Sequence, residues 1–180
     1  TTYMNAYEEL QTIEGLRPAN VYSVNANYLF LQKYMLSLFY ERTNDYFTMD
    51  MYQAKDRLAL VYRTQNWDYY QSFGMSANVP FNIGEWLSSQ VNATVVNDRN
   101  RCDNFWDIPF DRKKWACMLA MQNHFSVGSN LGFDLDAMYR SSMISGISDT
   151  KPVFTVNVGA QWNFLKDKAS LSLNCADLFD

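Results

Sequence analysis

The sequence contains no run of 18 or more apolar residues, so it offers no candidate for a transmembrane helix. Cysteine and histidine are scarce: the three cysteines are an odd number without a CxxC spacing, and His124 is the single histidine. A zinc site and a disulfide framework are therefore not expected, and we expect no cofactor. Cys117 and Cys175 fall instead on apolar strand positions, where small buried or lipid-facing side chains are expected.

Basic residues are also few. The 15 Lys and Arg residues stand against 19 Asp and Glu residues, which gives a formal net charge of -4. The two most basic stretches, 98–101 and 111–114, are interleaved with acids and are expected to be solvated loops. Nucleic acid is not expected as a partner, because phosphate binding needs clustered Lys and Arg. The chain begins at Thr1 without a visible signal peptide, so we expect a processed protein or a fragment.

Aromatic residues are abundant, at 16% of a chain that is 48% hydrophobic. This composition favours strands over helices. The clearest pattern is a closing hairpin, in which residues 155–164 and 169–175 alternate and a turn at 165–168 joins them. One side of the hairpin is apolar and carries Val156, Val158, Ala160, Trp162, Leu171 and Leu173. The other side is polar and carries Thr155, Asn157, Gly159, Gln161, Asn163, Ser170, Ser172 and Asn174.

The same alternation predicts about eight strands. They lie at residues 20–30, 34–41, 57–79, 87–95, 115–126, 133–140, 155–164 and 169–175. Residues 57–79 fit either two strands or one strand whose faces switch near Asn66-Trp67-Asp68. We expect one strand with a bulge, because it keeps the order of turns and loops regular. Residues 1–19 are expected to form an N-terminal loop with a short helical turn at 7–10, stopped by Gly15-Leu16-Arg17-Pro18.

The expected connections fall into two classes. Tight turns are expected near 31–33, 80–85, 128–130 and 165–168, and longer polar connections near 47–56, 97–113 and 141–151. Outer-membrane barrels sort their connections in this way, and strands of about 10–13 residues are long enough to cross a bilayer when tilted. The sequence therefore predicts an all-β fold, an antiparallel up-and-down meander of about eight strands that is part of a larger transmembrane β-barrel.

The polar strand positions are too hydrophilic for a packed core, since burying an unpaired amide or carboxylate costs about 1–3 kcal/mol. They must face water, either outside a soluble protein or inside a channel. These positions are Asn25, Asn27, Ser37, Glu41, Ser72, Ser76, Asn78, Gln90, Asn92, Asp134, Asp136, Asn157, Gln161, Asn163 and Asn174. Aromatic residues gather near both ends of the strands, a distribution typical of the two interfacial girdles of a membrane barrel.

Three motifs resemble those of TonB-dependent outer-membrane receptors. Gly15-Leu16-Arg17-Pro18 before an alternating strand resembles the N-x-x-L-x-P start of one of their strands, and Met138-Tyr139-Arg140-Ser141-Ser142 resembles the stretch before their late strands. Residues 163–179 resemble their F-x-x-x-K-x-x-L-x-L-x-x-x-D-x-F hairpin. The nearest match is the outer-membrane beta-barrel family common among Bacteroidetes.

This resemblance implies a fragment from the C-terminal half of a barrel of about 22 strands. Residues 20–180 would then form a partial outer-membrane β-barrel, with the plug domain and the last strands absent. The implied location is the outer membrane of a Gram-negative bacterium. The implied partners are outer-membrane lipid, the receptor's own plug domain, the TonB energy-coupling protein and a surface lipoprotein.

The function expected from the resemblance is that of a barrel-wall segment in a receptor that imports a nutrient ligand. Loops 44–56, 97–114 and 141–151 would contribute contacts, with Trp67, Asp103, Trp106 and Arg112 as the candidate ligand-contact residues, because aromatic rings next to charges suit sugars, peptides or chelates. The alternative is a self-contained eight-stranded barrel, either embedded in a membrane or a lipocalin-like soluble ligand-binding protein. An enzyme is not expected, because His124 lacks an evident Ser and Asp partner set and Asp134 and Asp136 suit a lumen lining.

Overall fold

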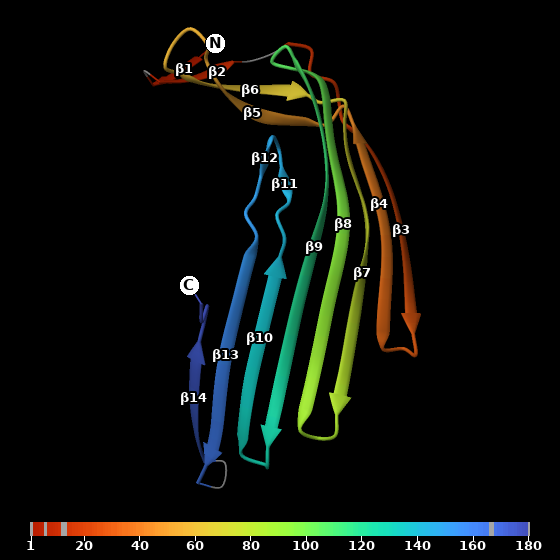
Figure 1. The fold of residues 1–180 in the computed structure, drawn as a ribbon, viewed down its shortest axis with the longest axis vertical. Helices are drawn as coiled ribbons and strands as arrows, with labels where there is room; N and C mark the ends of the chain where they lie inside the picture. Colours follow the sequence, from red (N-terminus) through yellow and green to blue (C-terminus); the bar gives the residue numbers. More distant parts are fainter. Residues whose placement is uncertain (1, 6, 12–13, 166–167, 180) are drawn as a thin grey trace.

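The computed structural model describes residues 2–5, 7–11, 14–165 and 168–179. Its main feature is an antiparallel sheet of eight strands in the order β14-β13-β10-β9-β8-β7-β4-β3 (Figure 1). The strands are β3 (Asn20–Phe30), β4 (Tyr34–Asn44), β7 (Tyr69–Ile83), β8 (Leu87–Phe105), β9 (Ile108–Val127), β10 (Leu131–Arg140), β13 (Val153–Phe164) and β14 (Ala169–Cys175). The predicted all-β meander is confirmed. Within the described ranges there is no helix that could cross a membrane.

The connections sort to the two ends of this sheet as predicted. Tight turns follow β3, β7 and β9 at one end, which we call the turn end, and the long connections lie at the other, the loop end (Figure 1). The first turn is closed by a hydrogen bond from the Lys33 N–H to the Phe30 carbonyl oxygen, 3.1 Å, with Leu31 and Gln32 at positive φ. Lys166 and Asp167 of the expected 165–168 turn lie outside the described residues.

The register gives the sheet one apolar face and one polar face. Trp162 pairs with Leu171 and Ala160 with Leu173, so the apolar side of the closing hairpin forms as predicted. On the polar face Asn78 Nδ2 donates to Asn92 Oδ1 across β7 and β8. Many large apolar side chains stay exposed, among them Val24 at 66% and Leu173 at 66%. Within the described ranges, therefore, no protein layer packs over most of the apolar face.

Aromatic side chains form two bands on the apolar face. The turn-end band contains the stacked pairs Phe30–Tyr34 and Trp86–Phe125, and the loop-end band contains Phe73 and Trp115 in edge-to-face contact at 5.4 Å. On β9, Trp115 and Phe125 are separated by about ten residues, which in a tilted strand span a height of ~25 Å. This is the height of the apolar band of a membrane barrel.

A second, smaller sheet lies across the loop end (Figure 1). It has the order β1-β2-β6-β5, formed by β1 (Thr2–Asn5), β2 (Glu8–Gln11), β6 (Leu60–Asn66) and β5 (Phe47–Gln53). Its buried core consists of Ala54, Ala59 and Val61, with Tyr52 and Trp106 packed against it. A short hairpin, β11 (Ile144–Ser145) and β12 (Ser148–Asp149), fills the connection between β10 and β13. Ordered structure therefore crowds the loop end.

Two expectations need correction. The helical turn expected at residues 7–10 is wrong: residues 8–10 belong to β2, whose backbone pairs in parallel with β6 and which buries Glu9 against Arg57. The single bulged strand expected at 57–79 is wrong: β6 and β7 are separate strands in different sheets. The faces switch at Trp67-Asp68, close to the expected place, because the chain changes sheets there.

The three long loops contain regular structure. Residues 47–53 form β5, and β8 and β9 extend through most of 97–113 as one hairpin with Trp106 and Asp107 at its turn. Both turn residues have positive φ, 52° and 67°. The hairpin is held by polar pairs such as Arg99–Asp111. Because polar residues occupy both of its faces, the sequence shows no apolar alternation there.

Candidate functional site

The polar face meets the folded connections at the loop end, and a charged cluster marks the place. Cross-strand pairing on β8 and β9 sets Asp98 opposite Lys114 and Asn100 opposite Arg112. Asp149, from β12, accepts hydrogen bonds from Arg112 Nη2 and Lys114 Nζ, each 2.9 Å long. We call Asp98, Arg112, Lys114 and Asp149 the charged cluster. Its two cations, Arg112 and Lys114, belong to β9 of the large sheet and bind Asp149 of the β11–β12 hairpin.

The charged cluster and its neighbours hold the β11–β12 hairpin against the polar face. Asn100 Nδ2 donates to the Gly146 carbonyl oxygen, 3.2 Å, and Lys114 Nζ donates to Ser142 Oγ, 2.5 Å. Lys114 and then Arg112 hold the pKa of the Asp149 carboxyl below its usual range. Because Asp149 stays ionised, the hairpin remains attached at neutral pH.

The tip of the β8–β9 hairpin carries an aromatic and cationic stack. The Trp106 ring stacks on Tyr52 with ring centroids 4.2 Å apart, and the Arg63 guanidinium lies over the Trp106 ring at 3.7 Å. Tyr52 and Arg63 belong to β5 and β6, so this stack attaches the hairpin to the small sheet. Its primary role in the fold is packing between the two sheets.

The four candidate contact residues lie in different surroundings. Trp67 is 0% exposed and offers no surface to a ligand in this structure. Trp106 lies in the stack at the hairpin tip, and Arg112 lies in the charged cluster. Asp103 is exposed, pairs with Arg101 over 2.9 Å, and donates its backbone N–H to Asp68. The structure does not gather these four residues into one site, and ligand contact by each stays a prediction.

Sequence reasoning missed four residues of the loop-end site: Asp98, Asn100, Lys114 and Asp149. The signal was present in the stretches 98–101 and 111–114, which were interpreted as solvated loops. As two strands of one hairpin, these stretches place Asp98 and Asn100 opposite Lys114 and Arg112. Antiparallel pairing of the two stretches would have predicted this part of the site, but not the contact with Asp149.

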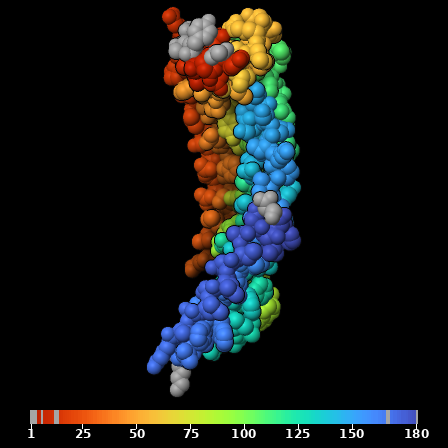
Figure 2. Space-filling model, turned by 90° about the vertical axis from the view of Figure 1, so that its left-hand side faces the viewer, coloured from red at the N-terminus to blue at the C-terminus, as the bar shows by residue number. Residues whose placement is uncertain are grey.

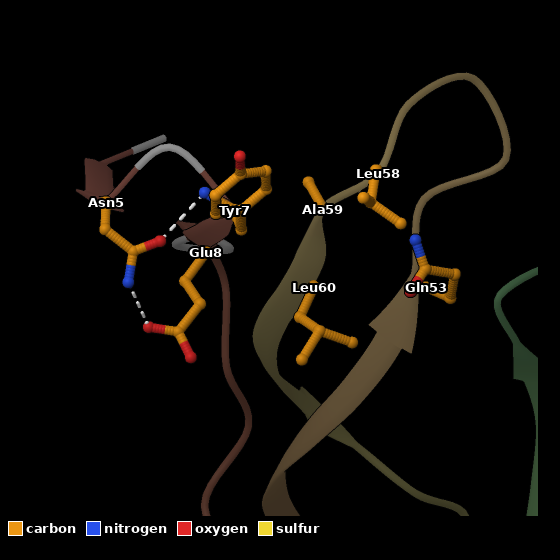
Figure 3. Close-up of a pocket in the computed structure, with 7 residues that line it drawn as sticks. All are labelled: Asn5, Tyr7, Glu8, Gln53, Leu58, Ala59 and Leu60. Carbon is orange, nitrogen blue, oxygen red and sulfur yellow. Dashed lines mark hydrogen bonds between the residues drawn. The ribbon is translucent and has the colours of Figure 1, made fainter.

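An open apolar pocket lies at the end of the small sheet where its central strands β2 and β6 begin (Figure 3). Its volume is about 570 Å³, within the size range of small-molecule pockets. It lies between the start of β2 and the loop that joins β5 to β6, and is lined by Asn5, Tyr7, Glu8, Gln53, Leu58, Ala59 and Leu60. Leu58 is 77% exposed at its rim. The pocket is suited to bind an apolar group of a ligand or partner.

A polar hollow of about 270 Å³ lies on the polar face towards the turn end. There His124 Nδ1 lies 2.7 Å from Asp134 Oδ1, and both side chains are 52% exposed. Gly132 leaves room for the ring, because a Cβ there would lie 3.0 Å from His124 Cε1. Ser88 is the cross-strand neighbour of His124, but the described residues show no hydrogen bond between the two. The part of the chain that the structure describes also holds no group of three or more His, Cys, Asp or Glu placed to bind a metal.

The family model described as "Outer membrane protein beta-barrel family" matches residues 2–180. No curated protein and no solved structure matches the chain.

Proposed function

The chain belongs to the outer membrane protein beta-barrel family and so lies in the outer membrane of a Gram-negative bacterium; from this we propose that it forms part of the wall of a wider, plugged barrel that imports a nutrient as a TonB-dependent receptor. The exposed apolar face then lies against lipid, between the two aromatic bands. The polar face lines the lumen, and the loop end is extracellular because barrel loops are long on that side.

The observation that carries this proposal is the pair of unpaired sheet edges. Every residue of β3 is exposed, and its outer edge pairs with none of the described strands. The outer edge of β14 is likewise unpaired in the described sheet, and the two edges lie at opposite sides of it (Figure 1). Figure 2 shows the molecule from the β14 side, with the small sheet at the loop end. Lipid does not tolerate open edges, so both edges need partner strands.

The polar face favours a wide lumen over a closed eight-stranded barrel. An eight-stranded barrel leaves an interior that its own side chains fill. Here the polar face carries half-exposed carboxylates such as Asp134 and also carries the β11–β12 hairpin with Asp149. The outer-membrane assignment also leaves no place for the soluble lipocalin-like alternative, whose apolar face would turn inward. A wider barrel whose remaining strands and plug come from outside this chain accommodates these features.

Two surfaces of the loop end are suited to contacts in such a receptor. The charged cluster lines the lumen at its mouth, where a plug or a polar ligand would meet it. The apolar pocket beside Tyr7 and Leu58 lies where β2 and β6 begin, and a ligand or a surface lipoprotein would bind it there. Neither surface supplies a nucleophile with a base, so the proposal assigns no catalytic step.

Conductance in planar bilayers tests the proposed barrel type, using the protein purified from outer membranes. A wide plugged barrel is silent as isolated and conducts after urea unfolds the plug. An eight-stranded barrel stays silent in both states, and an open porin conducts in both. Silence followed by large, urea-dependent conductance is expected. Either of the other two patterns would contradict the proposal.

Energy coupling is tested in cells. Strains lacking this protein and strains lacking the TonB energy-coupling protein are grown on a panel of single nutrients. We expect every nutrient whose use requires this protein to require the coupling protein also. A nutrient that needs this protein but grows normally without the coupling protein would contradict TonB-dependent import.

A further inference from the structure

One cross-strand row on the lipid-facing side is cationic. Arg42 pairs with Gln71, Gln71 with Arg99, and Arg99 with Lys113, across β4, β7, β8 and β9. We call these four residues the cationic row. Two residues nearer the turn end, the next row on the same side contains Tyr40, Phe73, Asn97 and Trp115. The cationic row therefore lies ~7 Å along the strands beyond the loop-end aromatic band.

The two arginines of the row are held by one aromatic ring. Tyr69 is 9% exposed, and the Arg42 guanidinium lies over its ring at 4.0 Å. The Arg99 guanidinium lies 5.7 Å from the same ring. Neighbouring strands are ~4.8 Å apart, so Arg99 and Lys113 are adjacent while Arg42 lies ~10 Å from Arg99. The row presents three cations along a line parallel to the membrane surface.

Acidic side chains on this side of the sheet lie farther from the aromatic band. Arg99 donates two hydrogen bonds to Asp111, of 2.8 and 2.6 Å. Asp111 pairs with Arg101 in the next row outward, and Asp103 lies beyond that row. Among the described residues neither Arg42 nor Lys113 forms an ion pair. The row nearest the membrane is thus free of acids and has uncompensated positive charge.

We propose that the cationic row binds the phosphorylated headgroup of an outer-leaflet glycolipid of the lipid A type. The headgroups of the outer leaflet lie just beyond the aromatic band at the extracellular end of a barrel. Guanidinium and ammonium groups are the usual protein donors to phosphate, and basic sites beside a membrane segment recognise anionic headgroups. The acyl chains would lie against the apolar face below. This inference rests on the outer-membrane location and does not depend on nutrient import.

Binding is measured by native mass spectrometry of the purified protein in detergent, titrated with monophosphorylated lipid A. The variant R42Q/K113Q removes the two uncompensated cations, and K33Q/K55Q removes the same charge at the turn end and in the loop after β5. At about a fivefold loss for each surface cation, R42Q/K113Q should bind lipid A roughly 25-fold more weakly. K33Q/K55Q should bind it as the wild type does.

Two further arms identify the ligand chemistry and guard against misfolding. Dephosphorylated lipid A should bind the wild type as weakly as lipid A binds R42Q/K113Q, and inorganic phosphate alone should show no saturable binding. The single variant K113Q changes an exposed side chain and should fold normally, with a few-fold loss. Equal lipid A affinity of the wild type, K113Q and R42Q/K113Q would overturn the proposal, as would equal binding of dephosphorylated lipid A or saturable binding of free phosphate.

Discussion

The indole N–H of Trp67 donates a hydrogen bond to the Asp50 carboxylate over 2.7 Å, at the point where the chain passes from the small sheet into the barrel wall. Both side chains are buried, at 0% and 6% exposure. Phe105 and Phe110 from the β8–β9 hairpin contact the indole edge-to-face at 5.6 and 5.1 Å. This bond therefore joins the small sheet to the wall.

Trp67→Phe keeps an aromatic ring in this site and removes the donor. The buried Asp50 then keeps only Gln65 as a side-chain donor, at 3.1 Å. Leaving a buried acceptor short of a partner costs about 1–3 kcal/mol, so amide exchange in β5 and β6 should accelerate roughly 5- to 150-fold. Hydrogen–deuterium exchange measures this. Trp162→Phe, at an exposed site in the turn-end band, is the control and should leave these amides unchanged.

The ionisation of Asp50 gives the small sheet a pH dependence. Burial raises the pKa of its carboxyl above the usual value, against the lowering effect of the Trp67 and Gln65 hydrogen bonds. Between the unfolded and folded pKa values only the folded form holds the proton. Asp50 therefore makes the free energy of unfolding fall as pH rises through that window, and the contribution is level above it.

Fluorine NMR of 5-fluorotryptophan protein measures that ionisation, with the Trp67 signal assigned from Trp67→Phe. The signal should titrate above the ordinary aspartate range of about 3.9, and the titration should vanish in Asp50→Asn. A Trp67 signal that titrates at or below the ordinary value, or that still titrates in Asp50→Asn, would contradict the assignment.

The sequence predicts the barrel wall better than it predicts the loop end. The closing hairpin was predictable with its register, because Val156 to Leu173 alternate without interruption and lipid demands one apolar face. The switch at Asn66-Trp67-Asp68 was located but misinterpreted, since a bulge and a change of sheet both invert the apolar positions. The pairing of β6 with β5 and with Glu8–Gln11 distinguishes them, and the second of these contacts is far apart in sequence.

The candidate site was less predictable than the fold. Trp67 and Trp106 were expected to contact a ligand because aromatic residues beside charges suit binding, yet the structure uses both rings to pack the loop end. Arg112 was also expected to contact a ligand, and in the structure it pairs with Asp149 from a hairpin 37 residues away in sequence. Spacing along the chain carries no information on such a contact.

Glycine is required at position 74 because the backbone of β8 and the Phe39 ring lie very close to it on the polar face. A Cβ at this position would collide with the Val95 carbonyl oxygen and lie 2.8 Å from Phe39 Cζ. Gly74→Ala should therefore destabilise the barrel by about 2 kcal/mol or more, because the backbone contact cannot be relieved by a rotamer change. Urea unfolding in lipid vesicles measures it. Ser76→Ala, two residues along the same face, should change stability far less, and adding Phe39→Ala to Gly74→Ala should restore only part of the loss.

Asp149 holds the β11–β12 hairpin against the lumen wall. Asp149→Asn removes the charge that Arg112 and Lys114 share, so amides of residues 143–150 should exchange faster at neutral pH while those of β9 stay protected. Asp136→Asn on the polar face is the matched control. In the wild type the lowered pKa of Asp149 means that its ion pairs persist until pH falls below the ordinary aspartate range and are then lost. An unchanged exchange rate at 143–150 in Asp149→Asn would show that the hairpin is held by other contacts.

In the proposed receptor these eight strands are an arc of a wider barrel wall, with the polar face on the lumen. Electron cryomicroscopy of the protein purified from outer membranes, in lipid nanodiscs, would show which strands pair with the outer edges of β3 and β14. We expect each edge to be hydrogen-bonded to a strand other than these eight, and a plug to fill the lumen. A closed barrel in which β3 pairs directly with β14 would contradict the proposal.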